Sequence, residues 1–507
     1  MNTTDLFLWI VILPLIASPV IYLAGRLVVR NGGTPMIARL LAILTMAVET
    51  GLLVIASSYV LNNYGVKFSV GEVRLEFDGV SIILAGIAVV LGLLVMVYST
   101  RYMRGENGEE KFYALLSMMI GTIIGLCCTR DLFNLWVWFE AMAISSYMLV
   151  AFYRSQPASL EAGVKYLVQS ATGSVMVLLG IALVFGKTGA LDFASIQSVL
   201  LTYAEGEKTA LLLCAGGLFL VGFGVKTALV PLHTWLPDAH SQAPSGISAM
   251  LSGVVIEAGM VAMLRSVGVL NTLTLDWGPI ILGFAALNLL VGNFMALRQT
   301  QVKRLLAYSS ISHMGYILLG IGFAVTFSNQ DGATGAFFHL LNHGMMKGLA
   351  FLGVGALLYS LHISREDHGP LVVEDLNGAS KRYPITVFCL SVGLLALGGL
   401  PPFSGLWSKW QIFVSGFETQ NPWAIGLVIF AALNSVLSLA YYAPLVNRMY
   451  RKEPSEIVTK GNPIDWRLAV PLVILAAGVI VIGFYPALVT PLTQAAGSDL
   501  LRMFGLF

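Results

Sequence analysis

The chain has 507 residues, of which 57% are hydrophobic and only 11% are charged, and its mean hydropathy is +0.81. A soluble protein of this length would carry about a quarter charged residues. These values exclude a soluble globular protein and indicate an integral membrane protein that contacts the lipid bilayer. With a net charge of +2, no nucleic-acid partner is expected.

Apolar runs of about 20 residues recur along the chain, and a helix of that length crosses about 30 Å of hydrocarbon. About fourteen such spans are predicted, so the expected fold is an all-α integral membrane bundle. The predicted spans are 5–26, 36–61, 79–98, 112–129, 132–153, 163–186, 209–229, 244–265, 278–297, 304–326, 332–360, 384–416, 422–447 and 468–492.

The loops between these spans differ in charge on the two sides of the membrane. One side receives 19 of the 29 lysines and arginines and the other side receives seven. The positive-inside rule therefore places the first side in the cytoplasm and both termini on the outer side of a prokaryotic cell membrane.

A few ionisable residues fall inside the spans instead of in the loops. At this depth each one costs at least about 2.5–3.5 kcal/mol on insertion scales, so each is a functional candidate. They are Lys226, Lys347, Lys409, Glu49, Glu140 and Glu257.

The seventh span carries Lys226 and is followed by two prolines, Pro231 and Pro237, in GVKTALVPLHTWLPDAHSQAPSG (224–246). Proline removes a backbone donor and clashes with the preceding turn, so both prolines are expected to interrupt the helix. Unwound backbone is tolerated at membrane depth only where protein or a water-filled cavity satisfies it. Lys226 is therefore expected at the edge of a polar cavity.

The twelfth span shows the same combination of prolines and a lysine in LGGLPPFSGLWSKW (397–410), where Pro401 and Pro402 precede Lys409. Interrupted helices at corresponding positions indicate an inverted-repeat transporter. Because the seventh and twelfth helices are five apart, helices 4–8 and 9–13 are predicted to be two inverted five-helix repeats. The predicted parts are N-terminal flanking helices 1–3 (1–111), a first repeat (112–270), a second repeat (271–450), and the fourteenth helix with the tail (451–507).

Several stretches resemble the antiporter-like subunits shared by respiratory complex I, Mrp-type sodium/proton antiporters and membrane-bound energy-converting hydrogenases. The resemblance covers roughly residues 80–450. The matching stretches are NLWVWFEAMAISSYMLV (134–150), VKTALVPLHTWLPDAH (225–240), VKRLLAYSSISHMGYI (302–317), FFHLLNHGMMKGLAFL (337–352) and GLPPFSGLWSKW (399–410).

The eighth helix, SAMLSGVVIEAGMVAMLR (248–265), departs from this pattern. Members of the family often have lysine before the Ala-Gly pair, whereas this chain has Glu257. Either protons follow a different route in this chain, or Glu257 pairs with a nearby lysine.

The resemblance and the buried charges together predict a path for protons or cations across the middle of the membrane. Glu140 and Lys226 are expected to pair, either as a switch of proton affinity or as a static ion pair. His339, His343 and Lys347 are spaced i, i+4, i+8 and share one helix face. Structural hydrogen bonding and a zinc site on the two histidines are the alternatives, and the zinc site lacks a third ligand. The predicted path residues are Glu140, Lys226, Glu257, His313, His339, His343, Lys347 and Lys409.

The residues beside the first break have two possible roles. His233, Asp238 and His240 either admit protons to Lys226 or satisfy unwound backbone.

Other polar residues are assigned to structure. Asp131 and Arg130 are expected to cap the fifth helix and mark an interface. Lys303 and Arg304 are expected to be cytoplasmic anchors. Glu49 lies outside the repeats and is expected to contact a partner subunit.

No dinucleotide, phosphate-binding or nucleophile motif is found, and the four cysteines lack metal-ligand spacing, so no cofactor or metal is expected in this chain. The predicted function is ion translocation by one subunit of a larger membrane complex. The resemblance implies other membrane subunits as partners, with redox subunits carrying iron–sulfur or nickel–iron centres in a complex I-like or hydrogenase-like enzyme. A Mrp-type antiporter without redox chemistry and a transport-inactive scaffold are the alternatives.

Overall fold

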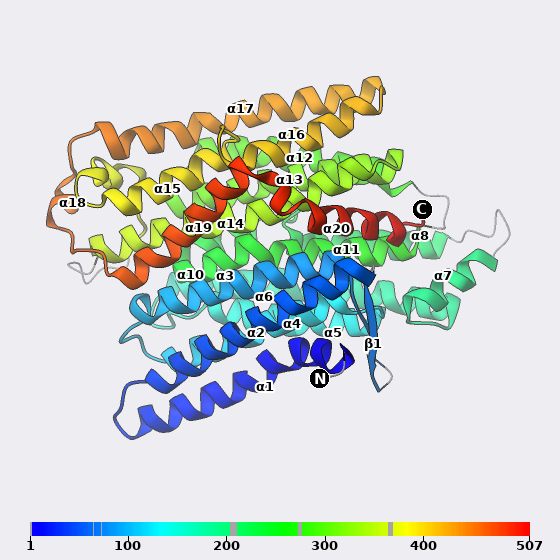
Figure 1. Ribbon diagram of the computed structural model, residues 1–507, viewed down its shortest axis with the longest axis horizontal. Helices are drawn as coiled ribbons and strands as arrows, with labels where there is room; N and C mark the ends of the chain where they lie inside the picture. The colour runs from blue at the N-terminus through cyan, green and yellow to red at the C-terminus, as the bar shows by residue number, and fades with distance from the viewer. Residues whose placement is uncertain are drawn as a thin grey trace.

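The computed structural model describes residues 3–63, 65–71, 73–202, 210–271, 276–362 and 369–506. Within these residues, 13 helices are long and apolar enough to cross a membrane. Most of them run side by side along one direction (Figure 1). The predicted all-α integral membrane fold is confirmed.

The N-terminal part consists of three long helices and a short β-hairpin. The two strands pair antiparallel, with Val66 opposite Phe77. The elements are α1 (Thr3–Arg30), α2 (Met36–Asn63), β1 (Val66–Val70), β2 (Val73–Phe77) and α3 (Gly79–Tyr102).

The next part contains the first broken helix and a short π-helical segment. Its elements are α4 (Glu109–Cys128), α5 (Leu132–Val150), α6 (Pro157–Thr188), α7 (Phe193–Thr202), α8 (Ala210–Thr227), α9 (Trp235–Gln242), α10 (Ser245–Met250), η1 (Leu251–Val255) and α11 (Ile256–Val269).

The third part contains the second broken helix. Its elements are α12 (Trp277–Leu297), α13 (Val302–Phe327), α14 (Gln330–His362), the 3₁₀ turns η2 (Val373–Leu376) and η3 (Ala379–Lys381), α15 (Pro384–Leu397), α16 (Ser404–Glu418) and α17 (Pro422–Arg451). The C-terminal elements are α18 (Glu456–Lys460), α19 (Trp466–Phe484), η4 (Pro486–Leu488) and α20 (Thr490–Met503).

Capping residues at the helix starts explain several boundaries. Side chains at the N-cap accept hydrogen bonds from the first free backbone N–H groups, and proline fits the first turn because its missing N–H would have no partner there. Asp78, Asp131, Asp276, Asn421 and Asp465 are such caps, and α6, α15 and α17 begin with proline.

Both predicted helix breaks are present. Helix α8 ends at Thr227 and α9 starts at Trp235, while α15 ends at Leu397 and α16 starts at Ser404. Pro231, Pro401 and Pro402 lie in the breaks. The prediction for Pro237 was wrong: it lies in the first turn of α9, where proline disrupts no helical hydrogen bond.

The two broken helices have similar surroundings. Helix α6 packs against both α8 and α9, and α14 packs against both α15 and α16. This likeness fits the predicted pair of five-helix repeats. Their boundaries and inverted relation remain a prediction.

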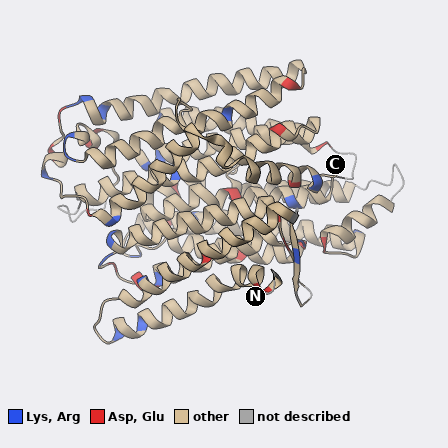
Figure 2. Cartoon of the chain, in the orientation of Figure 1, with Lys and Arg blue, Asp and Glu red and all other residues tan. Residues whose placement is uncertain are grey.

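The centre of the bundle is formed by α10–η1–α11, α13 and α14, which are almost wholly buried, while α2 and α17 lie at the rim. Lys and Arg concentrate at the left-hand end in Figure 2, where the α1–α2 loop lies, and both termini lie toward the right. Two cations counted for the positive-inside rule, Lys208 and Arg365, fall outside the described residues. The outer placement of the termini remains a prediction.

Candidate functional site

Lys226 is buried at the end of α8 among hydroxyl groups. Its Nζ donates to the Tyr166 hydroxyl at 2.5 Å and to Ser146 Oγ at 3.2 Å, and these two hydroxyls lie 2.8 Å apart. The ammonium also lies 4.4 Å from the centre of the Tyr166 ring, which stacks on Trp235 of α9 at 4.0 Å. Side chains of α5, α6 and α9 therefore surround Lys226 at the break after α8.

Glu140 lies on α5 within electrostatic reach of Lys226, but among the described interactions the two form no ion pair. Its Oε1 is buried without a hydrogen-bond partner. The direct ion pair expected between Glu140 and Lys226 is therefore not observed. Lys226 is hydrogen-bonded to hydroxyl groups instead, and the Glu140 carboxyl group lies nearby.

Among the described residues, Glu257 is hydrogen-bonded to a histidine and forms no ion pair with a lysine. Its Oε1 lies 2.8 Å from Nδ1 of His343, and both side chains are fully buried. Glu257 Oε2 and His343 Nε2 have no hydrogen-bond partner. The proposed pairing of Glu257 with a lysine was wrong, because α11 faces α14 at His343.

Two further histidines continue from this pair. His313 Nδ1 lies 3.0 Å from His339 Nε2, and His339 Nδ1 lies 2.9 Å from Ser408 Oγ. The His313 and His343 rings are stacked with centroids 5.4 Å apart. Side chains of α11, α13, α14 and α16 thus form one contiguous buried row, called here the central row: Glu257, His343, His313, His339 and Ser408.

Lys347 and Lys409 lie beside the central row and are held by neutral oxygens. Lys347 Nζ donates to the Leu306 carbonyl at 2.9 Å and to Ser309 Oγ at 2.5 Å. Lys409 Nζ donates to the Leu397 carbonyl at 2.9 Å and to Ser435 Oγ at 3.0 Å.

In addition, Lys409 Nζ lies 4.5 Å from the centre of the Tyr316 ring. This arrangement resembles that of Lys226 over Tyr166. The three residues spaced along one face of α14, His339, His343 and Lys347, have three different sets of partners.

The residues at the first break divide into two groups. Asp238 is ion-paired to Arg304 at 2.6 Å and to Lys165 at 3.2 Å, so it anchors α9. His233 has its Nδ1 buried without a partner. His240 is fully buried, stacks on Phe351, and has no hydrogen-bond partner for either ring nitrogen.

Unwound backbone at this break is satisfied by a residue that sequence analysis missed. Asn288 of α12 accepts from Val230 N at 2.9 Å and donates to the Ala228 carbonyl at 3.3 Å. An asparagine inside an apolar span is the signal that could have identified it. Since neither ring nitrogen of His240 has a hydrogen-bond partner, its ring has no part in satisfying this backbone.

Two structural assignments were wrong because the side chains are buried. Lys303 is only 7% exposed and donates to the Ala243 carbonyl at 2.5 Å, so it is no solvated anchor. Glu49 is fully buried inside this chain, with no hydrogen-bond partner for either carboxyl oxygen, so it is not available to a partner subunit.

A buried ionic cluster, also missed, lies where the β-hairpin meets α3 and α11. Arg265 is fully buried and its Nη2 lies 3.1 Å from both carboxyl oxygens of Asp78. Arg130 contacts Asp78 at 2.7 Å and Glu76 at 2.9 Å. Asp131 caps α5 as expected, whereas Arg130 belongs to this cluster.

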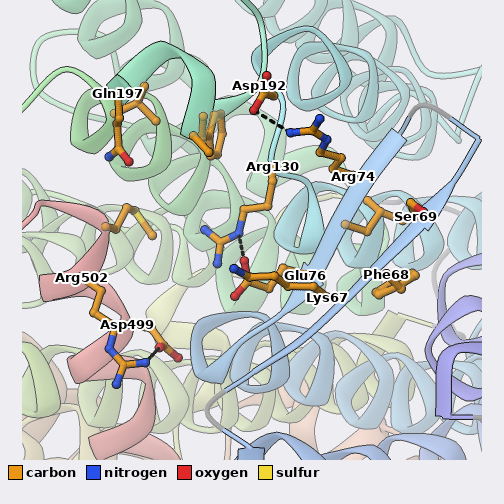
Figure 3. Close-up of a pocket in the computed structure, with 15 residues that line it drawn as sticks. Lys67, Phe68, Ser69, Arg74, Glu76, Arg130, Asp192, Gln197, Asp499 and Arg502 are labelled. Carbon is orange, nitrogen blue, oxygen red and sulfur yellow. Dashed lines mark hydrogen bonds and ion pairs between the residues drawn. The ribbon is translucent and has the colours of Figure 1, made fainter. Parts of the chain in front are cut away.

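The ionic cluster borders a cavity of about 640 Å³, lined in part by Arg74, Arg130 and Asp499 (Figure 3). Burial works to raise the pKa of Asp78, but the Arg265 and Arg130 guanidiniums lower it to about 2. Burial and the neighbouring Asp78 raise the pKa of Asp499 to about 6. Asp499 also accepts a hydrogen bond from Gly79 N at 2.7 Å.

Among the described residues, no group of three or more His, Cys, Asp or Glu side chains is placed to hold a metal ion. The central row places one carboxyl group, three imidazoles and one hydroxyl in succession inside a membrane bundle. Buried titratable groups of this kind are typical of membrane proteins that move ions.

Comparison with known families agrees with this class. Residues 129–435 match the family described as NADH:quinone oxidoreductase/Mrp antiporter, TM, and residues 68–113 match NADH-Ubiquinone oxidoreductase (complex I), chain 5 N-terminus. The chain belongs to this family of antiporter-like membrane subunits.

The relatives come from different complexes. The chain is 32% identical over 434 residues to F(420)H(2) dehydrogenase subunit N of Methanosarcina mazei, covering 84% of this chain and 85% of that one. It is also 32% identical over 458 residues to hydrogenase-4 component B of Escherichia coli, covering 86% of this chain and 65% of that longer protein.

A solved structure has the same fold over nearly the whole length. A chain of the membrane-bound sulfane sulfur reductase, an archaeal respiratory membrane complex, superposes with a TM-score of 0.85 at 28% identity. The match covers 99% of each chain.

Proposed function

We propose that this chain is the ion-translocating subunit of a redox-driven complex in a prokaryotic plasma membrane, and that it carries protons. Its relatives in dehydrogenase, hydrogenase and sulfur reductase complexes support the redox assignment. The observation that carries the proton assignment is the central row, in which an acid and three histidines succeed one another at hydrogen-bond or stacking distance.

His339 is the clearest relay residue in the row. One ring nitrogen faces His313 and the other faces Ser408. An imidazole can accept a proton on one nitrogen and release the proton from the other, and it does so near neutral pH. A proton on His313 can therefore leave toward α16 and Lys409 through His339.

The step from His343 to His313 has a different geometry. The rings are stacked with centroids 5.4 Å apart, and His343 Nε2 has no hydrogen-bond partner. A ring rotation or a water molecule is needed to carry a proton across. We propose that proton transfer from His343 to His313 is the step at which the path is controlled.

Lys226 joins the central row through the packing of α8 against α11. A Cβ on Gly259 would lie 2.9 Å from Lys226 Cβ and 3.0 Å from its Cγ, so the glycine lets the lysine stem lie against the turn that carries Glu257. Movement of α8 would therefore shift the turn of α11 that carries Glu257. Glu140 would favour the charged form of Lys226 when the two are close.

Energy for transport must come from partner subunits. We propose redox subunits with iron–sulfur or nickel–iron centres, by analogy with the relatives. A Mrp-type sodium/proton antiporter remains the second candidate, because the matching family includes Mrp antiporters. A transport-inactive scaffold is the third candidate, because Glu257 replaces the lysine expected from the family resemblance.

The test is purification of the native complex in mild detergent, followed by identification of its subunits and by transport assays in vesicles. Metal-containing redox subunits and proton uptake driven by electron transfer are expected. His339→Gln keeps a hydrogen-bond donor and an acceptor at this position but cannot relay a proton, so it should slow transport roughly 100-fold, the usual effect of losing a positioned proton-transfer group.

Three results would contradict the proposal. Copurification of small membrane subunits alone would favour the antiporter. Unchanged proton transport by His339→Gln would exclude the central row as the path. Absence of any transport by the intact complex would favour the scaffold.

A further inference from the structure

A groove runs between α2 on one side and α14, α19 and α20 on the other, with α3 as its floor. Its inner section is a cavity of about 320 Å³ lined mostly by aliphatic side chains, among them Leu53, Ile83, Leu91, Leu341 and Leu475. This section lies at the level of membrane-spanning segments of α2, α3, α14 and α19. It is therefore an apolar recess within the hydrocarbon layer.

The groove has a polar mouth. One to two turns further along α2, at Val60, a second cavity of about 440 Å³ lies against α20. Gln330, Gln494, Ser498 and Asp499 line it, and its lining residues include no lysine or arginine. Apolar depth and a polar mouth with one carboxyl group and no cation match the chain and the uncharged or zwitterionic headgroup of a lipid.

A partner helix about 10 Å wide is the alternative occupant of the groove. A single hydrocarbon chain is narrow enough to enter it. A positively charged mouth, which an anionic headgroup would require, is not found among the lining residues.

We propose that one hydrocarbon chain of a membrane lipid with an uncharged or zwitterionic headgroup occupies this groove. The chain contacts α14 at Leu341, Gly344 and Met345, which flank His343 in sequence. The lipid thus fills the space between the rim helix α2 and the helix that carries two histidines of the central row. This site is independent of which ion the protein transports.

Two glycines provide a matched pair of variants. Gly86 lines the inner section, and a Cβ built on it meets no atom within 4 Å, so Gly86→Leu adds a side chain to the groove from a position where its Cβ is unobstructed. Gly51 on α2 has the same open surroundings but does not line the groove, so Gly51→Leu is the control.

The test uses the intact complex in lipid nanodiscs that contain phosphatidylethanolamine with a diazirine on one tail. After illumination, labelled positions are mapped by mass spectrometry. Labelling of the wall residues Ile83 on α3 and Leu341, Gly344 and Met345 on α14 is expected in the wild type. Gly86→Leu should reduce it at least fivefold, and Gly51→Leu should leave it unchanged.

The wild type alone can overturn the proposal, so the test does not depend on correct folding of a variant. Unlabelled α14 wall residues, or density for a partner side chain or a quinone tail in the groove of the purified complex, would overturn it. Equal labelling in Gly86→Leu and Gly51→Leu would do the same. None of these readouts measures transport.

Discussion

At the scale of single residues, the buried lysines are solvated by neutral oxygens and aromatic faces. Lys226 has Ser146 and Tyr166, while Lys409 has a carbonyl, Ser435 and the Tyr316 ring. Hydroxyls and carbonyls accept hydrogen bonds from an ammonium group without adding a negative charge. A direct carboxylate partner would favour the charged form of the lysine strongly. This environment suits lysines that gain and lose protons.

Lys226→Ala should therefore abolish proton transport by the intact complex and leave its assembly normal. Lys226→Arg is the sharper variant, because arginine keeps the charge but cannot release its proton. Both variants should be inactive in a vesicle transport assay. Wild-type transport by either one would refute the lysine relay.

Glu257→Lys restores the lysine expected from the family resemblance, yet it should not be tolerated here. The new ammonium would replace the acceptor of His343 and would lie near Lys347, which already acts electrostatically on that histidine. We expect reduced transport and a lower melting temperature of the purified complex. Glu257→Gln, which keeps the shape without a charge, is the control for stability, and full activity of Glu257→Lys would mean that the charge reversal is incidental.

At the scale of elements, the two helix breaks and the buried ionic cluster position the path. The cluster joins α3, the α4–α5 loop and α11, the helix that carries Glu257. Removing one member of a buried ion pair leaves an uncompensated charge and costs about 3–5 kcal/mol. The end of α11 that carries Arg265 is therefore expected to depend on this contact.

Arg265→Ala should lower the apparent melting temperature of the complex strongly. Arg74→Ala, which removes the more exposed ion pair with Asp192, should change stability by only about 0–1 kcal/mol. Thermal unfolding of both variants checks this difference. Similar melting temperatures would show that the buried pair contributes little.

At the scale of the whole molecule, a hydrogen bond from Gly79 N to the Asp499 carboxyl group connects the C-terminal helix α20 to the start of α3. The pKa of Asp499 is raised to about 6, above its ordinary value of 3.8, whereas Asp78 beside it stays ionised. A raised pKa means that the folded state binds the proton more tightly. Its contribution to stability is thus fully present below about pH 4 and is lost as the pH rises through about 6.

Docking of α20 should accordingly weaken, on the order of 1 kcal/mol, between pH 4.5 and pH 7. Hydrogen exchange of α20 amides, corrected for the intrinsic rate at each pH, measures this change. Asp499→Asn, which cannot ionise, should show no such dependence. A pH dependence that persists in Asp499→Asn would assign the effect to another group.

The amino-acid sequence alone was enough to identify the membrane class, thirteen of the fourteen predicted spans and both helix breaks; the twelfth predicted span, 384–416, is divided into two shorter helices. Apolar length and proline act locally, through the hydrocarbon thickness and the loss of a backbone donor, so no tertiary information is needed. The sequence motifs around Lys226 and Lys409 also identified the family, because a motif is read from contiguous residues. Pro237 was misassigned because its effect depends on where the next helix begins.

Which polar groups meet follows from the tertiary packing of the helices. Glu257 and His343 are far apart in the chain, and their contact depends on how α11 faces α14. The burial of Lys303 and Glu49, the Asp78–Arg265 pair and the groove beside α14 likewise arise from the packing of distant helices. Helical spacing shows which residues share a face, but the partner of that face is set by long-range packing, which a single sequence does not encode locally.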